Sequence, residues 1–183
     1  MSTATSKSTL VLVFEGIEEV EALMPVDILR RAGVHVVVAS LDDSDSVTGR
    51  NGIIITPDTH FSRVSPHHFD LIYLPGGPGV LPLAKHLTLR ALLRQQHEDG
   101  KLIAALCAAP SVLAAEGLLD DISATAHISV RADLPNPSQD RVVVDHKIIT
   151  SQGLGTALEF SLELVKQLID DTAALEVAKS IHN

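Results

Sequence analysis

The chain has 183 residues, of which 45% are hydrophobic and 20% charged, a balance typical of a folded globular protein. A formal net charge of −9, with no run of lysine or arginine, argues against nucleic acid or an anionic membrane as a partner. One cysteine cannot form an intramolecular disulfide, and residues 1–8 lack the basic start and apolar core of a signal peptide. No apolar stretch is long enough to cross a bilayer. These observations predict a cytoplasmic protein whose residues 1–8 are flexible.

Short apolar runs rich in β-branched residues alternate with longer segments of helical periodicity. In chain order the pattern predicts a strand at 9–14, a helix at 18–32, a strand at 34–39, a strand or hairpin at 47–56 around Asn51-Gly52, a strand at 70–74, a helix at 87–99, a strand at 101–106, a helix at 109–116, strand-like pieces at 123–126, 142–145 and 147–150, and helices at 153–168 and 172–181. This alternation indicates one α/β domain over residues 1–183, with a mostly parallel sheet covered by helices on both faces.

Ligands of such a sheet bind beyond the carboxyl ends of its strands, and Cys107 follows one of those ends directly. The residues around it are small, as a tight strand-to-helix turn requires, and Pro110 suits a first helical turn. A helix N-terminus at Cys107 would lower the pKa of the thiol and make it a nucleophile. A buried, inert cysteine is an equal alternative on this stretch alone.

Two neighbouring features could serve such a thiolate. Residues 75–79 form a glycine-rich loop at a strand end, where backbone N–H groups can approach a reacting atom, although a simple turn also explains it. Glu18, Glu19 and Glu21 open the first helix, where acids are expected from the helix dipole. Glu21 would have a raised pKa if it were buried beside a thiolate, and could then donate a proton to sulfur.

The nine histidines show no pair at the spacing of a helical zinc site, so the sequence predicts no metal. His67-His68 is interpreted as a solvated pair in a surface loop. His127 follows a short apolar strand and could face Cys107, but a structural histidine is the simpler interpretation.

Four stretches together resemble the ThiJ/PfpI superfamily, in the branch of the parkinsonism-associated deglycase known as DJ-one and its bacterial ThiJ-type relatives. They are Glu18-Glu-Val-Glu-Ala-Leu-Met-Pro-Val-Asp27, Leu74-Pro-Gly-Gly77, Ile103-Ala-Ala-Leu-Cys-Ala-Ala-Pro110 and Thr150-Ser-Gln-Gly-Leu-Gly-Thr-Ala157. They occur in family order and spacing, and they span nearly the whole chain.

The resemblance implies a flavodoxin-like sandwich that forms a homodimer. It also implies roles for particular residues: Cys107 as the reactive cysteine, Glu21 as the protonated glutamate that bonds it, His127 as the nearby histidine, Gly77 and Ala108 as backbone N–H donors of the oxyanion site, and Arg50 as the arginine near the site across the dimer. The family's proline after the histidine is Ile128 here.

The activity implied by this resemblance is a cofactor-free glyoxalase or deglycase. Its substrates would be small reactive aldehydes, methylglyoxal and glyoxal, or the glycated protein groups that they form. The alternative is a redox sensor or chaperone without enzymatic activity, which works through oxidation of the same Cys107. A glutamine amidotransferase would need a late His-x-Glu pair, whereas His146 is followed by Lys147 and Ile148.

Overall fold

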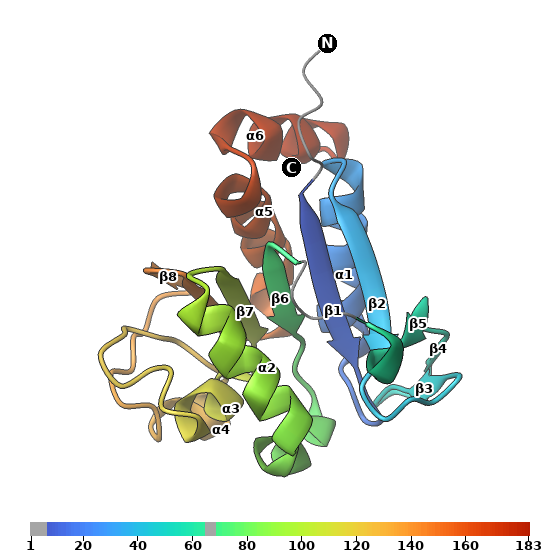
Figure 1. The fold of residues 1–183 in the computed structure, drawn as a ribbon. Helices are drawn as coiled ribbons and strands as arrows, with labels where there is room; N and C mark the ends of the chain where they lie inside the picture. The colour runs from blue at the N-terminus through green and yellow to red at the C-terminus, as the bar shows by residue number, and fades with distance from the viewer. Residues whose placement is uncertain (1–6, 65–68) are drawn as a thin grey trace.

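The computed structural model describes residues 7–64 and 69–183, and within them seven strands form one sheet (Figure 1). Its order is β5-β2-β1-β6-β7-β9-β8, and all neighbouring strands run parallel except β8, which is antiparallel to β9. The five central strands, numbered along the chain, follow the order 2-1-3-4-5 of flavodoxin-like folds. The predicted mostly parallel sheet is confirmed.

The strands are β1 (Ser8–Val13), β2 (His35–Ser40), β3 (Val47–Thr48), β4 (Ile54–Ile55), β5 (Thr59–His60), β6 (Leu71–Leu74), β7 (Leu102–Leu106), β8 (Val142–Asp145) and β9 (Ile148–Ser151). The α-helices are α1 (Glu19–Arg31), α2 (Leu87–Glu98), α3 (Pro110–Ala115), α4 (Ile128–Arg131), α5 (Ala157–Leu168) and α6 (Asp171–Ser180). Strands β3 and β4 pair with each other as an antiparallel hairpin apart from the main sheet.

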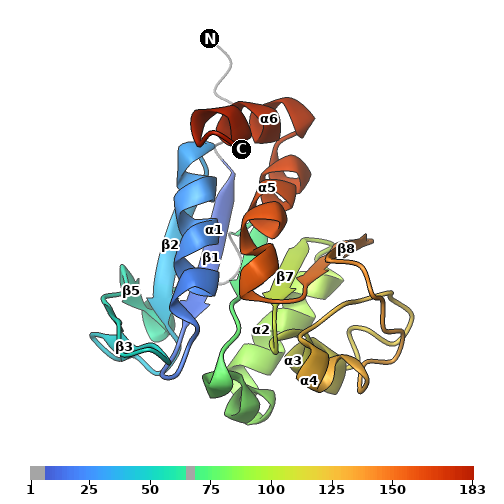
Figure 2. The same ribbon diagram turned by 180° about the vertical axis from the view of Figure 1, so that it is seen from behind.

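Helices cover both faces of the sheet, as the sequence predicts. Helices α1 and α5 lie on one face, and α2 lies on the other (Figures 1 and 2). Strands β1, β6 and β7 are buried along nearly their whole length, because side chains of both faces pack under helices. No helix in the described part of the chain is long and apolar enough to span a membrane.

Most predicted elements are confirmed with small shifts at their ends, but two expectations are wrong. Residues 123–126 do not form a strand, because the backbone of Ala124 bonds to Asn136 and Ser138 in a neighbouring loop. Flexibility through residue 8 is also wrong for Ser8, which opens β1 and donates its N–H to Asp70 at 2.9 Å. Residues 1–6 and the pair His67-His68 lie outside the described residues.

Pro25 interrupts the hydrogen bonds of α1, and a tyrosine of the sheet fills the gap. A proline has no N–H, so the carbonyl of Glu21, four residues earlier, lacks its helical donor. The Tyr73 hydroxyl, on strand β6, donates to this carbonyl at 2.7 Å, and Tyr73 is fully buried. Tyr73 therefore ties the backbone of Glu21 to the centre of the sheet.

We expect Tyr73→Phe to lower the free energy of unfolding by about 1–3 kcal/mol, because it leaves the buried Glu21 carbonyl without a donor. Urea denaturation would measure this loss. The control is Pro25→Ala, which restores an N–H to the helix at that carbonyl. In the Pro25→Ala background, Tyr73→Phe should cost clearly less, and an equal cost in both backgrounds would contradict the role assigned to Tyr73.

Candidate active site

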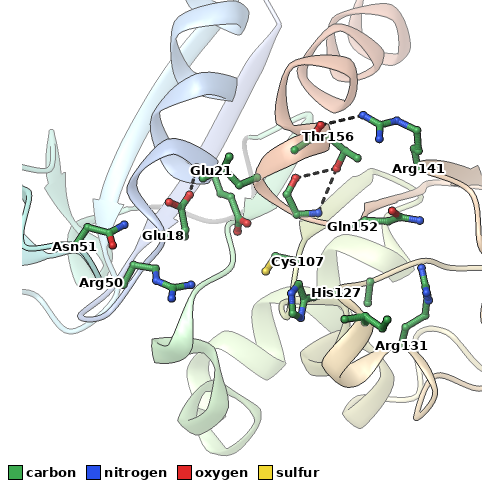
Figure 3. Close-up of a pocket in the computed structure, with 15 residues that line it drawn as sticks. Glu18, Glu21, Arg50, Asn51, Cys107, His127, Arg131, Arg141, Gln152 and Thr156 are labelled. Carbon is green, nitrogen blue, oxygen red and sulfur yellow. Dashed lines mark hydrogen bonds between the residues drawn. The ribbon is translucent and has the colours of Figure 1, made fainter.

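A cavity of about 590 Å³ opens beyond the carboxyl ends of β1, β7 and β9 (Figure 3). This is the crevice where the strand order reverses between β1 and β6, the usual ligand site of open α/β sheets. Residues from loops far apart in the sequence line it, among them Glu18, Glu21, Arg50, Cys107, His127 and Arg131.

Cys107 is held in a strained turn directly after β7. Its φ angle is 63°, in the left-handed region that residues other than glycine rarely adopt. Its N–H donates to the Ser151 carbonyl at 3.0 Å, and its own carbonyl accepts the His127 N–H at 2.7 Å. The half-buried side chain consequently faces the cavity from a backbone that is fixed on both sides.

Glu21 lies against this thiol. Its side chain is 1% exposed, shares a hydrogen bond with Cys107 and accepts the Gly76 N–H at 3.1 Å. Burial raises the pKa of Glu21 to about 7. Burial, followed by the charge of Glu21, raises the pKa of Cys107 to about 12. The expected lowering of the Cys107 pKa by a helix N-terminus is therefore wrong, also because α3 begins only at Pro110.

The two groups share one proton over a wide pH range. Once the pair has lost its first proton, with a pKa of about 7, the remaining negative charge opposes loss of the second. The N–H groups of Gly77 and Ala108 donate to the sulfur and favour the charge there. Those of Gly76 and Leu154 donate to the carboxylate. The proton can thus move between oxygen and sulfur with donors in place for either charge.

This contact between acid and thiol requires a glycine at position 76. A Cβ atom on Gly76 would lie 2.4 Å from both the Cys107 Cβ and the Glu21 Oε2, closer than real atoms approach. The neighbouring Gly77 has a φ of 114° and begins a 3-10 helix at Pro78–Lys85. The glycine-rich loop is therefore a site of close backbone approach and not a simple turn.

His127 lines the same cavity, and its ring orientation is set by Ser129. The Ser129 N–H donates to the His127 Nδ1 at 3.2 Å, and the Ser129 hydroxyl lies 2.8 Å from the same nitrogen. A backbone N–H can only donate, so Nδ1 is unprotonated and the neutral ring carries its proton on Nε2. No three His, Cys, Asp or Glu side chains within the described residues are grouped as metal ligands would be.

Arg50 reaches the cavity from the turn between β3 and β4, and Glu19 holds that turn. The Glu19 side chain is 2% exposed and accepts the Asn51 backbone N–H at 2.7 Å and the Asn51 side-chain amide at 3.0 Å. Burial pushes the pKa of Glu19 upward, but these hydrogen bonds hold it below its ordinary value. Arg50 lines the cavity of its own chain.

From the sequence, Glu18 and Glu19 were expected to be no more than acids at a helix start. Glu18 does cap α1, since its side chain accepts the Glu21 N–H at 2.7 Å, and it also lines the cavity. Glu19 positions the turn that carries Arg50, which no local pattern indicates. The one available signal was the presence of three carboxylates among the four residues 18–21.

Comparison with known proteins identifies the family. The sequence model of the DJ-1/PfpI family matches residues 7–167. The chain belongs to this family. Protein dj-1beta of Drosophila melanogaster is 40% identical over 181 residues, covering 96% of this chain and 97% of that protein. The glutathione-independent glyoxalase DJR-1.2 of Caenorhabditis elegans is 37% identical over 170 residues, covering 90% of each.

Solved structures of DJ-1/PfpI proteins share the fold over nearly the whole chain. The crystal structure of Drosophila melanogaster DJ-1beta has a TM-score of 0.93 at 39% identity, covering 97% of this chain and 98% of that one. Oxidized Toxoplasma gondii DJ-1 has a TM-score of 0.92 at 37% identity, covering 96% and 98%. The predicted superfamily and flavodoxin-like sandwich are confirmed.

The shared proton predicts an unusual titration of the thiol. We expect little thiolate absorbance around pH 7, where Glu21 loses its proton, and a rise in the ultraviolet absorbance only at much higher pH, with a midpoint of about 12. Glu21→Gln keeps an N–H donor but removes the opposing charge. Its thiol should therefore titrate at a lower pH than the wild-type thiol, because the negative charge that raises the Cys107 pKa is gone.

Cys107→Ser is the control for this titration, because it removes the only thiol of the chain. A wild-type thiolate absorbance that rises around neutral pH would contradict the expectation. The first proton would then come from the sulfur, and Glu21 would stay protonated.

Proposed function

We propose that this protein is a cofactor-free, cysteine-dependent glyoxalase or deglycase-type enzyme, acting on methylglyoxal, glyoxal or their adducts with protein groups. The observation that carries the proposal is the hydrogen bond between the buried Glu21 carboxyl and the Cys107 thiol at the wall of an open cavity. A family member 37% identical to this chain is named a glutathione-independent glyoxalase, which supports the same chemistry here.

The reaction would begin with the Cys107 thiolate. It attacks the aldehyde carbon, a C–S bond forms, and the carbonyl oxygen becomes an oxyanion near the N–H groups of Gly77 and Ala108. Glu21 protonates that oxygen to give the hemithioacetal. The Glu21 carboxylate then removes the C–H proton, which gives an enediol as the hydroxyl proton passes to the neighbouring oxygen. Glu21 returns its proton to the neighbouring carbon, which leaves a thioester of the hydroxy acid. Water hydrolyses the thioester, so methylglyoxal plus water becomes lactate and a proton.

Glu21 and His127 are the two residues that could accept the C–H proton of the hemithioacetal. The tautomer of His127 favours Glu21 in this role. With Nδ1 occupied by Ser129, the neutral His127 offers an N–H from Nε2 and no free acceptor. We assign His127 to donating a hydrogen bond to the second carbonyl oxygen of the substrate. That leaves Glu21 as the group that accepts and returns the proton.

The resemblance implies a homodimer, and the composition predicts a cytoplasmic location; both stay predictions. Val20 and Leu23 are apolar residues of α1 that are 39% and 41% exposed, close in sequence to Glu18 and Glu21 of the cavity. Burial of this face against a second copy would bring the partner close to the turn of Arg50. Such a dimer would agree with the predicted place of Arg50 near the interface.

The test of the proposed function is the production of lactate from methylglyoxal. We expect Cys107→Ser, which differs by one atom, to abolish turnover without lowering the melting temperature appreciably. Glu21→Gln should reduce turnover by roughly 100-fold or more, the usual loss of a positioned acid/base. His127→Gln keeps an N–H donor and should lose less than about tenfold. Equal losses in the glutamate and histidine variants would contradict the assignment of the proton to Glu21.

The second candidate function is sensing of oxidants through the same thiol. It is favoured by Cys107 being the only cysteine, because a sulfenic acid then has no partner within the chain. Peroxide should add two oxygen atoms to Cys107, giving a sulfinic acid that the surrounding N–H donors stabilise. Intact mass spectrometry measures this uptake, with Cys107→Ser as the control. A disulfide-linked dimer as the main product would contradict the expectation.

A further inference from the structure

The cavity around Cys107 is lined by three arginines, although the chain as a whole has a net charge of −9. Arg141 is occupied: it pairs with Glu159 at 2.8 Å and donates to the Gly155 carbonyl at 2.9 Å. Arg50 and Arg131 differ, because neither guanidinium has a hydrogen bond or a carboxylate within 4.0 Å among the described residues. Two free cations therefore face one cavity.

Free arginines are the exception in this protein. Five of the eight pair with a carboxylate: Arg30, Arg31, Arg90, Arg94 and Arg141. The two unpaired arginines of the cavity lie on opposite sides of the thiol. Arg50 is on the side of Glu18, and Arg131 lies beyond His127 (Figure 3). A ligand that reacts at Cys107 thus lies between them.

The described carboxylates of the cavity form no salt bridge with these two guanidiniums. The Glu18 side chain is turned to the start of α1, where it accepts the Glu21 N–H at 2.7 Å. The single negative charge of the Glu21 and Cys107 pair faces backbone N–H donors. Both guanidiniums are therefore left to a ligand, in the planar form that binds carboxylate and phosphate oxygens in pairs.

We propose that Arg131, together with Arg50, forms an anion subsite beside Cys107, so that the enzyme selects carbonyl compounds that carry a carboxylate or phosphate group. This proposal rests on the proposed function and deepens it by naming the substrate class. The same subsite would hold the carboxylate of a hydroxy-acid product. An uncharged aldehyde such as methylglyoxal would use the thiol and the acid without using the arginines.

Two alkylating agents of nearly equal size test the subsite without any turnover. Iodoacetate is anionic and iodoacetamide is neutral, and in both cases the Cys107 thiolate displaces iodide as the C–S bond forms. We expect the ratio of the two rates to exceed that of a free small-molecule thiol, because the arginines attract the anion. The ratio should fall as ionic strength rises, since salt screens exposed charges.

Arg131→Gln should lower the rate ratio by about threefold or more, a size expected from one exposed charge pair. Arg63→Gln is the matched control: it removes the same charge from a residue that lies outside this cavity and forms no salt bridge with another described residue. Equal ratios in the two variants, or a wild-type ratio equal to that of the free thiol, would overturn the proposal. Competition by acetate and by inorganic phosphate then distinguishes the two anionic groups. Because alkylation needs no catalysis, a protein that fails to convert methylglyoxal can still pass this test.

Discussion

Two acidic groups buried in contact cannot both carry a negative charge, and this constraint governs the site of this DJ-1/PfpI protein. Glu21 and Cys107 hold a single proton between them across the neutral pH range. Each end of the pair has its own backbone donors, so moving the proton leaves no charge without a partner. A proton that moves at little cost is what both addition to a carbonyl and its reversal require.

The sheet brings the pair together from opposite sides. Helix α1 follows β1 and delivers Glu21, while the turn after β7 delivers Cys107, with the loop after β6 between them. Gly76 occupies that middle loop, and its missing side chain is the space in which carboxyl and thiol meet. The two reacting groups therefore meet at the crevice where the strand order reverses, and both line the cavity that Arg50 and Arg131 also line.

Local patterns were enough to predict the layered sheet and the turn at Cys107, because strands, small residues and Pro110 are adjacent in the sequence. The helix dipole was the wrong basis for predicting the pKa of the Cys107 thiol, because burial and the charge of Glu21 raise that pKa. Glu21 came from family resemblance, whereas Glu19 was missed. Contacts between distant segments, such as that of Glu19 with Asn51, leave no periodic signal in either segment, so they cannot be predicted from the sequence pattern.

The proline in α1 has a geometrical consequence for the active acid. Because Tyr73 can bond only the one carbonyl that Pro25 frees, α1 has a single favourable register against β6. A slip by one residue would move the Glu21 side chain about 1.5 Å along the helix axis and turn it by about 100°. The irregular helix thus helps to fix the carboxylate in both height and angle, whereas a regular helix, with every carbonyl bonded internally, would depend on side-chain packing alone.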